Sequence, residues 1–312
     1  MFPSPIIPNI SNETDLLKVV VLGLSQSLGP APRLKETFDA KSYESVLLNI
    51  YPTEDDITYE VNALYQALLN NGVKVLRPDL VVDCNQIFAR DVAFVIDNTL
   101  FISNLIPDRV LETGAMHSIL ELIPKTHIEY LPEKVHTEGG DILLYNDTLL
   151  IGCYLQADYP SYKMARTNQY AIDFLRERFP NKHIIPIELH KDDYDPRRGV
   201  LHLDCAFQPI GKGKALLYRE GLLNPKDVGL LEEIFGSNNL FYVTEEEAYM
   251  MSTNLISISP TKVISDKTFT RLNEHLSNAW GISVDTIPYQ EVAKMGGLLR
   301  CSTLPLIRQK ET

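Results

Sequence analysis

Apolar residues along this chain follow two alternating periods, one typical of strands and one typical of helices. Residues 16–24, LLKVVVLGL, are mostly apolar and predict a buried strand. Residues 55–71 place apolar side chains at helical spacing, and Gly72 is expected to end that helix before another strand. The same order of helix, glycine and strand returns at residues 267–288, where Gly281 separates the two elements. The pattern therefore predicts an α/β protein with an internal repeat.

Hairpin-like segments lie between these helix-and-strand segments. Residues 92–103 and 141–152 each consist of two apolar runs joined by an Asp/Asn dipeptide, which is a typical hairpin turn. A looser copy of the helix and strand lies at residues 165–189. A hairpin, a helix and a strand thus recur several times, which indicates a propeller-like or solenoid arrangement. No break in composition divides the chain, so we expect one repeat-built α/β domain over residues 1–312.

Composition mainly excludes classes of protein. The chain of 312 residues can bury a core without disulfides or metals, and its 45% apolar and 22% charged residues are typical of a soluble globular protein. No apolar stretch approaches the roughly 18 residues of a membrane helix, and the first fifteen residues lack an export signal. The formal net charge of -12 disfavours nucleic acid and suits a cationic small molecule. We expect a cytoplasmic protein that binds no membrane.

The cysteines are widely spaced and include no CxxC pair: Cys84, Cys153, Cys205 and Cys301. This spacing argues against a zinc ribbon and against a disulfide framework. We expect reduced thiols, most of them small buried apolar residues.

Four short segments carry side chains suited to chemistry. FARD ends in Asp91 at the start of a hairpin, and HTEGGD places Glu138 before two glycines. LHLD places His202 and Asp204 two residues apart, so we expect both on one face of a strand. The C-terminal MGGLLRCSTLPLIR places Cys301 after a glycine pair and a basic residue.

Each segment taken alone has an ordinary structural explanation. An isolated cysteine in an apolar strand is usually a core residue, and a Gly-Gly-Asp sequence is often a turn. An Arg-Asp dipeptide is commonly a surface pair that contributes little. Together the segments favour a site, because each acidic or imidazole residue stands at the edge of an apolar run. That placement predicts that these side chains face one shared space.

Three carboxylates and a histidine around one thiol suit a cationic substrate. Nearby negative charge disfavours a thiolate, and a bound cation or a protonated His202 would reverse that effect. A guanidinium fits because its planar donors pair with carboxylates, each charged hydrogen bond contributing about 1.5–3 kcal/mol. We therefore expect Cys301 to attack the central carbon of a guanidinium or ureido group. His202 and Glu138 are the candidates for moving protons.

At these residues the chain resembles the guanidino-group-modifying superfamily of arginine deiminases, dimethylarginine hydrolases and glycine amidinotransferases. The resemblance spans most of the chain and rests on segments in the same order: FARDVAFVIDNTLFIS, EGGDILLYNDTLLIG with the following ARTNQYAI, LHLDCAF, and GGLLRCSTLPLIR. It implies the pentein fold, a five-bladed α/β propeller of repeated ββαβ units with pseudo-fivefold symmetry.

The resemblance also implies a role for each candidate residue. Cys301 would be the nucleophile and would form a covalent amidino-thioether. Asp91 and Asp204 would hold the guanidinium, while Glu138 and His202 would transfer protons. The resemblance implies neither a metal nor an organic cofactor.

Two arginines and one insertion are further candidates for substrate binding. The resemblance implies that an arginine binds a substrate carboxylate, and we nominate Arg166 and Arg300 for this role; a solvated surface position is the alternative for both. Residues 153–164 form an aromatic insertion relative to arginine deiminases, which indicates a substrate lid, a specificity loop or a plain surface excursion. The long helical insertion of arginine deiminases is missing from this chain.

Hydrolysis is the reaction that we favour from the sequence. Water would resolve the intermediate to a ureido product and release ammonia or an amine, with arginine or an arginine derivative as the substrate. An amidinotransferase shares the first half of this reaction. A citrulline-type hydrolase would gain less from two aspartates, and a non-catalytic pentein binding protein or a papain-type thiol hydrolase are further alternatives. A homodimer is left open.

Overall fold

The repeat predicted from the sequence is present as five small sheets. The computed structural model describes residues 5–310; residues 1–4 and 311–312 lie outside it. The first four belong to the segment that is expected to lack an export signal. Within the described range the strands form five three-stranded sheets. In each sheet the middle strand pairs antiparallel with one neighbour and parallel with the other. The predicted unit of hairpin, helix and strand is confirmed.

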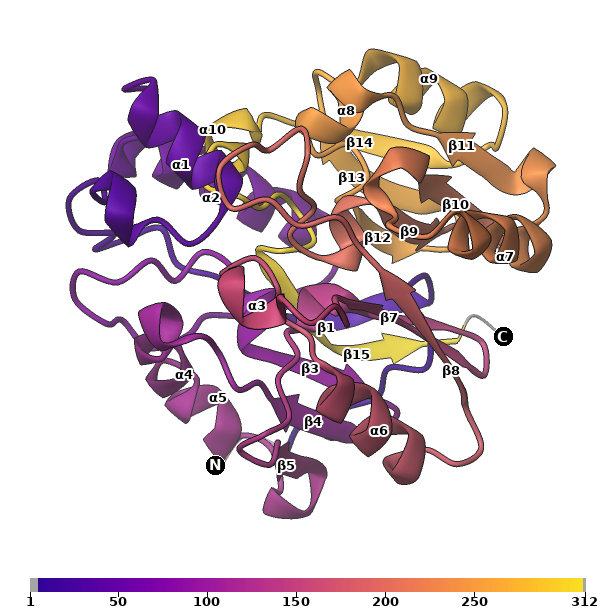
Figure 1. Ribbon diagram of the computed structural model, residues 1–312, viewed down its shortest axis with the longest axis horizontal. Coiled ribbons are helices and arrows are strands. Elements are labelled where there is room, and N and C mark those ends of the chain that lie inside the picture. The colour runs from indigo at the N-terminus through magenta and orange to yellow at the C-terminus, as the bar shows by residue number, and fades with distance from the viewer. Residues whose placement is uncertain (1–4, 311–312) are drawn as a thin grey trace.

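Four of the units run consecutively along the chain (Figure 1). Their strands are β3 (Ala93–Ile96), β4 (Thr99–Ile102) and β5 (Ile128–Tyr130); β6 (Ile142–Tyr145), β7 (Thr148–Cys153) and β8 (His183–Glu188); β9 (Phe207–Ile210), β10 (Lys214–Leu217) and β11 (Leu240–Tyr242); and β12 (Ile256–Ser259), β13 (Lys262–Asp266) and β14 (Ser283–Ile287). The helices between the second and third strands of these units are α4 (Leu111–Gly114) with α5 (His117–Glu121), α6 (Gln169–Arg178), α7 (Pro225–Phe235) and α9 (Thr270–Asn278).

The two ends of the chain build the fifth unit. The last strand, β15 (Thr303–Gln309), pairs antiparallel with the first strand, β1 (Leu16–Leu22). After α1 (Ala40–Leu47) and α2 (Glu54–Asn70), β2 (Lys74–Leu76) pairs parallel with β1. The repeat is therefore cut open inside a hairpin, which is why the sequence shows it incompletely.

Short helices fill the connections between these elements. They are α3 (Ala89–Val92), α8 (Glu245–Tyr249) and α10 (Gln290–Ala293), with the 3-10 helices η1 (Leu34–Glu36), η2 (Pro107–Arg109), η3 (Lys125–His127), η4 (Gly139–Asp141), η5 (Tyr159–Ser161), η6 (Leu203–Cys205), η7 (Arg219–Gly221) and η8 (Ser237–Asn239).

The predicted turns and helix ends are confirmed by the backbone. Asp97 and Asn146, in the turns of two hairpins, have φ angles of 53°, a left-handed conformation that Asp and Asn tolerate. Gly72 and Gly281, which follow α2 and α9, have φ angles of 71° and 64°. At both glycines the left-handed backbone ends the helix and turns the chain toward the next strand.

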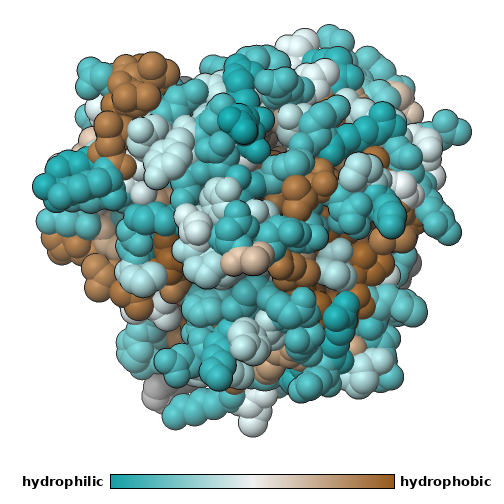
Figure 2. Space-filling model, in the orientation of Figure 1, coloured by the Kyte–Doolittle hydropathy of each residue, from teal (hydrophilic) through white to brown (hydrophobic). Residues whose placement is uncertain are grey.

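The sheets lie inside and the longer helices lie outside (Figure 1). Helix α6, for example, buries only Ala171, Ile172 and Leu175, the stripe that faces its sheet. The face shown in Figure 2 is mainly hydrophilic, with apolar areas scattered across it. Among the described residues no helix is long and apolar enough to cross a membrane.

Candidate active site

Each of the five units contributes one buried residue from the segment that leads into its first strand. These residues are Asp91 before β3, Glu138 before β6, Asp204 before β9, Asn254 before β12 and Cys301 before β15. Equivalent positions of a cyclic repeat lie around its axis, so residues distant in sequence meet at one end of the fold. Cross-unit hydrogen bonds link the segments: Arg90 N donates to Cys301 O over 3.0 Å, and Arg300 N donates to Asn254 O over 3.3 Å.

Glycines permit this close approach. A Cβ on Gly140 would lie 2.6 Å from the ring of His202, so the glycine pair of HTEGGD leaves room for the imidazole. A Cβ on Gly297 would lie 2.3 Å from the ring of Phe88 and 2.9 Å from Cys301 Cβ. The two glycine pairs noted in the sequence are thus packing requirements of the site.

His202 lies between two carboxylates. Its Nε2 is 2.9 Å from Glu138 Oε2, and its Nδ1 is 3.6 Å from Asp91 Oδ1. Burial lowers the pKa of His202, but the charges of Asp91, Glu138 and Asp141 outweigh burial and raise this pKa to about 9. The imidazole is therefore protonated at neutral pH.

Two buried arginines balance the charge of these carboxylates. Arg166 Nη1 lies 2.8 Å from Glu138 Oε1, and Arg109 Nη1 lies 2.7 Å from Asp91 Oδ2 and 3.4 Å from Glu138 Oε2. Burial raises the pKa of Glu138, but Arg166, the hydrogen bond from His202 and Arg109 outweigh it, so this pKa is held below its usual range. Glu138 is therefore an ionised carboxylate.

The thiol of Cys301 belongs to a second group of side chains. Its Sγ lies 3.9 Å from Asp204 Oδ2, and its backbone N–H donates to Asn254 Oδ1 over 3.0 Å. Cys205 Sγ donates to the other oxygen of Asp204 over 3.4 Å. The Cys205 and Cys301 sulfur atoms and the Asp204 carboxylate lie within 4.8 Å of one another. Asp204 thus connects two thiols.

The expectation that His202 and Asp204 share one face of a strand is wrong. Leu203–Cys205 is the 3-10 helix η6, and β9 begins only at Phe207. Cys205 N donates to His202 O, and Leu203 N donates to Asp141 Oδ1, so the chain turns here. The two side chains consequently reach different partners, Glu138 for His202 and Cys301 for Asp204.

The sequence profile of one known family matches most of the chain. The family is described as N,N dimethylarginine dimethylhydrolase, eukaryotic, and the match covers residues 40–308. The chain belongs to this family. Membership confirms the predicted place in the guanidino-group-modifying superfamily.

Curated relatives of this family member include a hydrolase of arginine. The chain is 30% identical over 247 residues to the uncharacterized protein YkgA of Bacillus subtilis, covering 78% of each. It is 25% identical over 264 residues to the arginine deiminase of Listeria monocytogenes (strain HCC23), covering 72% of this chain and 62% of the deiminase. The chain therefore spans less than two thirds of the length of that deiminase.

Solved structures with the same fold include two amidinotransferases and an arginine dihydrolase. An amidinotransferase of saxitoxin biosynthesis from Microseira wollei superposes with a TM-score of 0.76 at 18% identity, over 97% of this chain and 98% of that one. Inosamine-phosphate amidinotransferase from Streptomyces griseus gives 0.74 at 17% identity over 98% of both chains. The N-terminal domain of a cyanobacterial arginine dihydrolase gives 0.74 at 16% identity over 93% and 98%. These likenesses and the five sheets confirm the five-bladed pentein fold.

Arg166 and Arg300 both lie inside this family member, which rules out the surface position considered for them. Arg166 also donates to Phe38 O over 2.8 Å. Arg300 Nη1 lies 2.7 Å from Asp204 Oδ2, and its Nη2 lies 3.1 Å from Glu13 Oε1. These contacts hold the carboxylates of Glu138 and Asp204 in place. Binding of a substrate carboxylate by either arginine stays a prediction.

Sequence reasoning missed two residues of this site. Arg109 pairs with Asp91 and with Glu112, and Asn254 holds the backbone of Cys301. Arg109 offered no local signal, because its acidic partner Asp91 lies on another element. Asn254 could have been found from its place immediately before a hairpin-like run, the position that Asp91 and Cys301 share in their own units.

The insertion at residues 153–164 lies beside the site. Its first residue ends β7, and its middle forms η5 (Tyr159–Ser161). Near its end, Lys163 O accepts a hydrogen bond of 2.5 Å from Nε of Arg166, the partner of Glu138. Burial and the charges of Asp141 and Glu138 raise the pKa of Tyr159 to about 12. Gln156, by contrast, is exposed. Whether the insertion moves as a lid stays a prediction.

Two groups of side chains have the donors of a metal site. Asp91, Glu138 and His202 form one, and Asp204, Cys205 and Cys301 form the other. In the first group both carboxylates already pair with arginines, whose positive charge opposes a cation. In the second group, Arg300 pairs with Asp204, and its positive charge opposes a cation there as well.

Proposed function

We propose that this protein is a cysteine-dependent hydrolase of a guanidino compound, with Cys301 as the nucleophile. The observation that carries the proposal is the position of the Cys301 thiol, 3.9 Å from Asp204, on a backbone that accepts from Arg90 N. Arg90 precedes Asp91, which contacts the charged His202. A negatively charged wall beside a thiol favours a cationic substrate, because the cation offsets the repulsion between carboxylate and thiolate. Membership of the dimethylarginine dimethylhydrolase family supports the substrate class.

Asp91 offers the guanidinium an acceptor that the protein leaves unused. Its Oδ2 accepts from Arg109, but its Oδ1 and the neighbouring His202 Nδ1 have no hydrogen-bond partner among residues 5–310. A buried polar atom without a partner costs about 1–3 kcal/mol, which a substrate N–H group would recover. Asp204 would hold a second edge of the guanidinium, with Arg300 fixing its carboxylate.

The bound guanidinium stabilises the Cys301 thiolate, whose proton leaves to solvent, and this thiolate attacks the guanidinium carbon. A C–S bond forms, one C–N bond breaks, and the departing nitrogen takes a proton from His202. Water then attacks the amidino carbon and returns a proton to His202, the C–S bond breaks, and a ureido product leaves. The sum is the addition of one water and the release of ammonia or an amine.

The proposed role of Glu138 is to orient and charge His202. Proton transfer by Glu138 itself was the expectation from the sequence, but a carboxylate bound by Arg166, Arg109 and His202 has little tendency to take up a proton. A protonated His202 held by Glu138 supplies the acid that the first step requires.

Amidino transfer is the alternative reaction. Two amidinotransferases share the fold over nearly the whole chain, and both reactions need the same first half. They differ in whether an amine or water resolves the intermediate, so a product assay with and without an amine acceptor separates them.

The first experiment is a product assay with the purified protein. The panel holds arginine, methylated arginines, agmatine, guanidinoacetate and citrulline, each with and without glycine or ornithine. We expect ureido product and ammonia or amine from a guanidino compound without an acceptor. Turnover only with an acceptor would replace the hydrolase proposal with amidino transfer.

Variants test the covalent step. Cys301→Ala should abolish turnover, whereas Cys153→Ala, a buried cysteine in β7, should retain it. His202→Ala should slow both formation and hydrolysis of the adduct on Cys301, so turnover should fall, and intact-protein mass spectrometry after mixing with substrate measures which of the two steps is slowed more. Normal turnover in Cys301→Ala would exclude the mechanism.

A further inference from the structure

We propose that Cys205 and Cys301 are a paired dithiol that closes to an intramolecular disulfide when a peroxide oxidises Cys301. The disulfide would block the nucleophile reversibly. The loss of activity rests on the role proposed for Cys301 above, whereas formation of the disulfide does not depend on which substrate is used.

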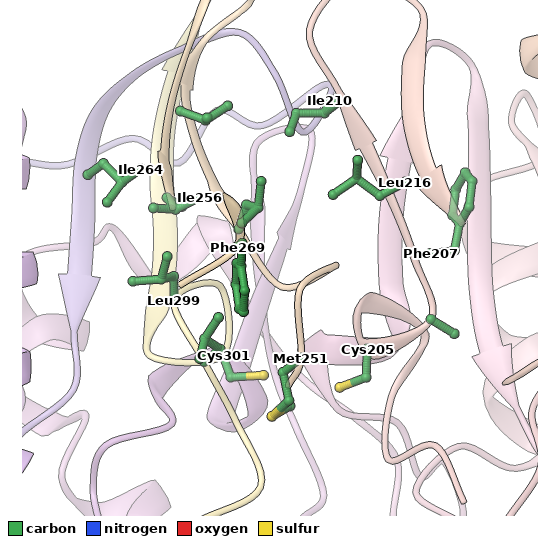
Figure 3. Close-up of a cluster of buried hydrophobic side chains, with 14 of the residues drawn as sticks. Cys205, Phe207, Ile210, Leu216, Met251, Ile256, Ile264, Phe269, Leu299 and Cys301 are labelled. Carbon is green, nitrogen blue, oxygen red and sulfur yellow. The ribbon is translucent and has the colours of Figure 1, made fainter. Parts of the chain in front are cut away.

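The two thiols come from different units of the fold and face each other. Cys205 ends η6 before β9, and Cys301 precedes β15. Their sulfur atoms lie within 4.8 Å of each other, and Figure 3 shows both side chains pointing into the space beside Met251. A disulfide needs a sulfur separation of about 2.05 Å, so side-chain rotation must close the remaining gap.

Cys205 also lines a cavity that a small oxidant could enter. This cavity of about 50 Å³ is walled by polar and apolar side chains that include Asp39, Arg197, Tyr249 and Met251. Asp39 Oδ2 is buried without a hydrogen-bond partner among the described residues, so this wall is polar. Peroxide is smaller than any guanidino substrate that reaches Cys301, and it therefore needs no larger opening.

The surroundings of the two cysteines give them different roles in the oxidation. The hydrogen bond with Cys301, burial and the charge of Asp204 raise the pKa of the Cys205 thiol well above its usual value. Cys205 therefore stays a thiol and reacts slowly with peroxide by itself. Cys301, the proposed nucleophile, is the sulfur that meets incoming electrophiles, and Cys205 is placed to resolve its oxidised form.

The chemistry balances with a peroxide as the oxidant. The Cys301 sulfur attacks one peroxide oxygen while its proton passes to the leaving oxygen through Asp204, whose Oδ2 lies 3.9 Å away, giving a sulfenic acid and water. The Cys205 sulfur then attacks Cys301 Sγ, an S–S bond forms, and the sulfenic oxygen leaves as water. The proton of Cys205 passes to that water through Asp204, whose Oδ1 already accepts from Cys205 at 3.4 Å. Two sulfurs are oxidised and one peroxide is reduced.

The pairing is specific among the cysteines. Cys153 Sγ donates instead to Ile187 O within its own sheet, at 3.6 Å. Cys84 Sγ contacts Asn85 O at 3.9 Å. Neither belongs to the group formed by Cys205, Cys301 and Asp204.

The test is peptide mapping of the full-length protein after treatment with hydrogen peroxide under non-reducing conditions. We expect a cross-linked peptide pair containing residues 205 and 301, a mass loss of two hydrogen atoms, and full reversal by dithiothreitol. Cys205→Ser should lose the cross-link and accumulate sulfinic acid on Cys301, which dithiothreitol does not reverse. Cys153→Ser is the matched control and should behave as the wild type.

Two outcomes would overturn the proposal. One is wild-type protein in which Cys301 proceeds to sulfinic acid as readily as in Cys205→Ser. The other concerns phenylarsine oxide, which bridges neighbouring thiols. Equal binding of this reagent to the reduced wild type and to reduced Cys205→Ser would show that the two thiols are not paired. Neither measurement uses a substrate, so an error in the proposed reaction would leave both results interpretable.

Discussion

His202 Nε2 lies 2.9 Å from Glu138 Oε2, and the same carboxylate receives Arg166 Nη1 at 2.8 and 2.9 Å from its two oxygens. This arrangement fixes the imidazole plane and directs Nδ1 toward Asp91. The ion pair also keeps His202 charged, which is the state required of an acid that protonates a leaving nitrogen. Several properties of the protein should follow from this contact.

Glu138→Gln should lower the pKa of His202 and weaken catalysis. The substitution preserves shape but removes the negative charge that favours imidazolium, so we expect at least about a 10²-fold fall in kcat/KM. The alkaline limb of the pH–rate profile should move to lower pH. Glu112→Gln is the matched control, since it removes an equally buried partner of Arg109 that does not touch His202. An unchanged His202 titration by NMR in Glu138→Gln would contradict this account.

The raised pKa of His202 predicts a loss of stability at alkaline pH. A histidine with a pKa of about 9 in the folded state and about 6.5 when unfolded stabilises the fold fully below about pH 6.5. That contribution, on the order of 3 kcal/mol, is lost as pH rises through 9. Urea unfolding of the wild type and His202→Gln between pH 6 and 10 measures it, as the difference between the two curves. Parallel curves would show that His202 is not protonated in the fold.

Asn254 should act as a positioning residue for the nucleophile. Asn254→Ala leaves the buried N–H of Cys301 without its acceptor, which should cost about 1–3 kcal/mol of stability and reduce kcat more than it changes KM. Asn254→Asp keeps an acceptor oxygen but adds charge near the thiol, so it should recover stability while slowing alkylation of Cys301 by iodoacetamide. If Asn254→Ala reacts and unfolds as the wild type does, the backbone contact is unimportant.

Breaking the Arg300 network should destabilise the fold strongly. Arg300→Met leaves the buried carboxylates of Glu13 and Asp204 unpaired, and we expect a loss of about 3–5 kcal/mol in urea unfolding. Adding Glu13→Gln should recover part of the lost stability, because it removes one buried charge that has no partner. Arg33→Met breaks an exposed ion pair with Glu36 and should unfold at the wild-type urea concentration.

The fold was predictable where local rules decide the backbone. The dipeptides at Asp97 and Asn146 require left-handed turns, and Gly72 and Gly281 end helices for the same reason, so hairpins, helices and strands could be placed in order. Closure of the ring by β1 and β15 could not be read in this way, because it joins the two ends of the chain.

The candidate residues could be named from the sequence, but their pairings could not. Asp91, Glu138, His202 and Cys301 stand at the edges of apolar runs, a local signal, and the structure buries all of them. The expectation for LHLD failed because the hydrogen bond that Leu203 N donates to Asp141, and those within the turn, outweigh strand alternation there.

By itself the sequence determined the repeat and the residue types that enter each hairpin. The tertiary structure alone decided that Arg109 pairs with Asp91, that Asn254 holds Cys301, and that Cys205 faces the same thiol. The reason is physical. Periodicity and turn chemistry act over a few neighbouring residues, whereas these contacts join segments from different units, brought together only when all five sheets pack around one centre.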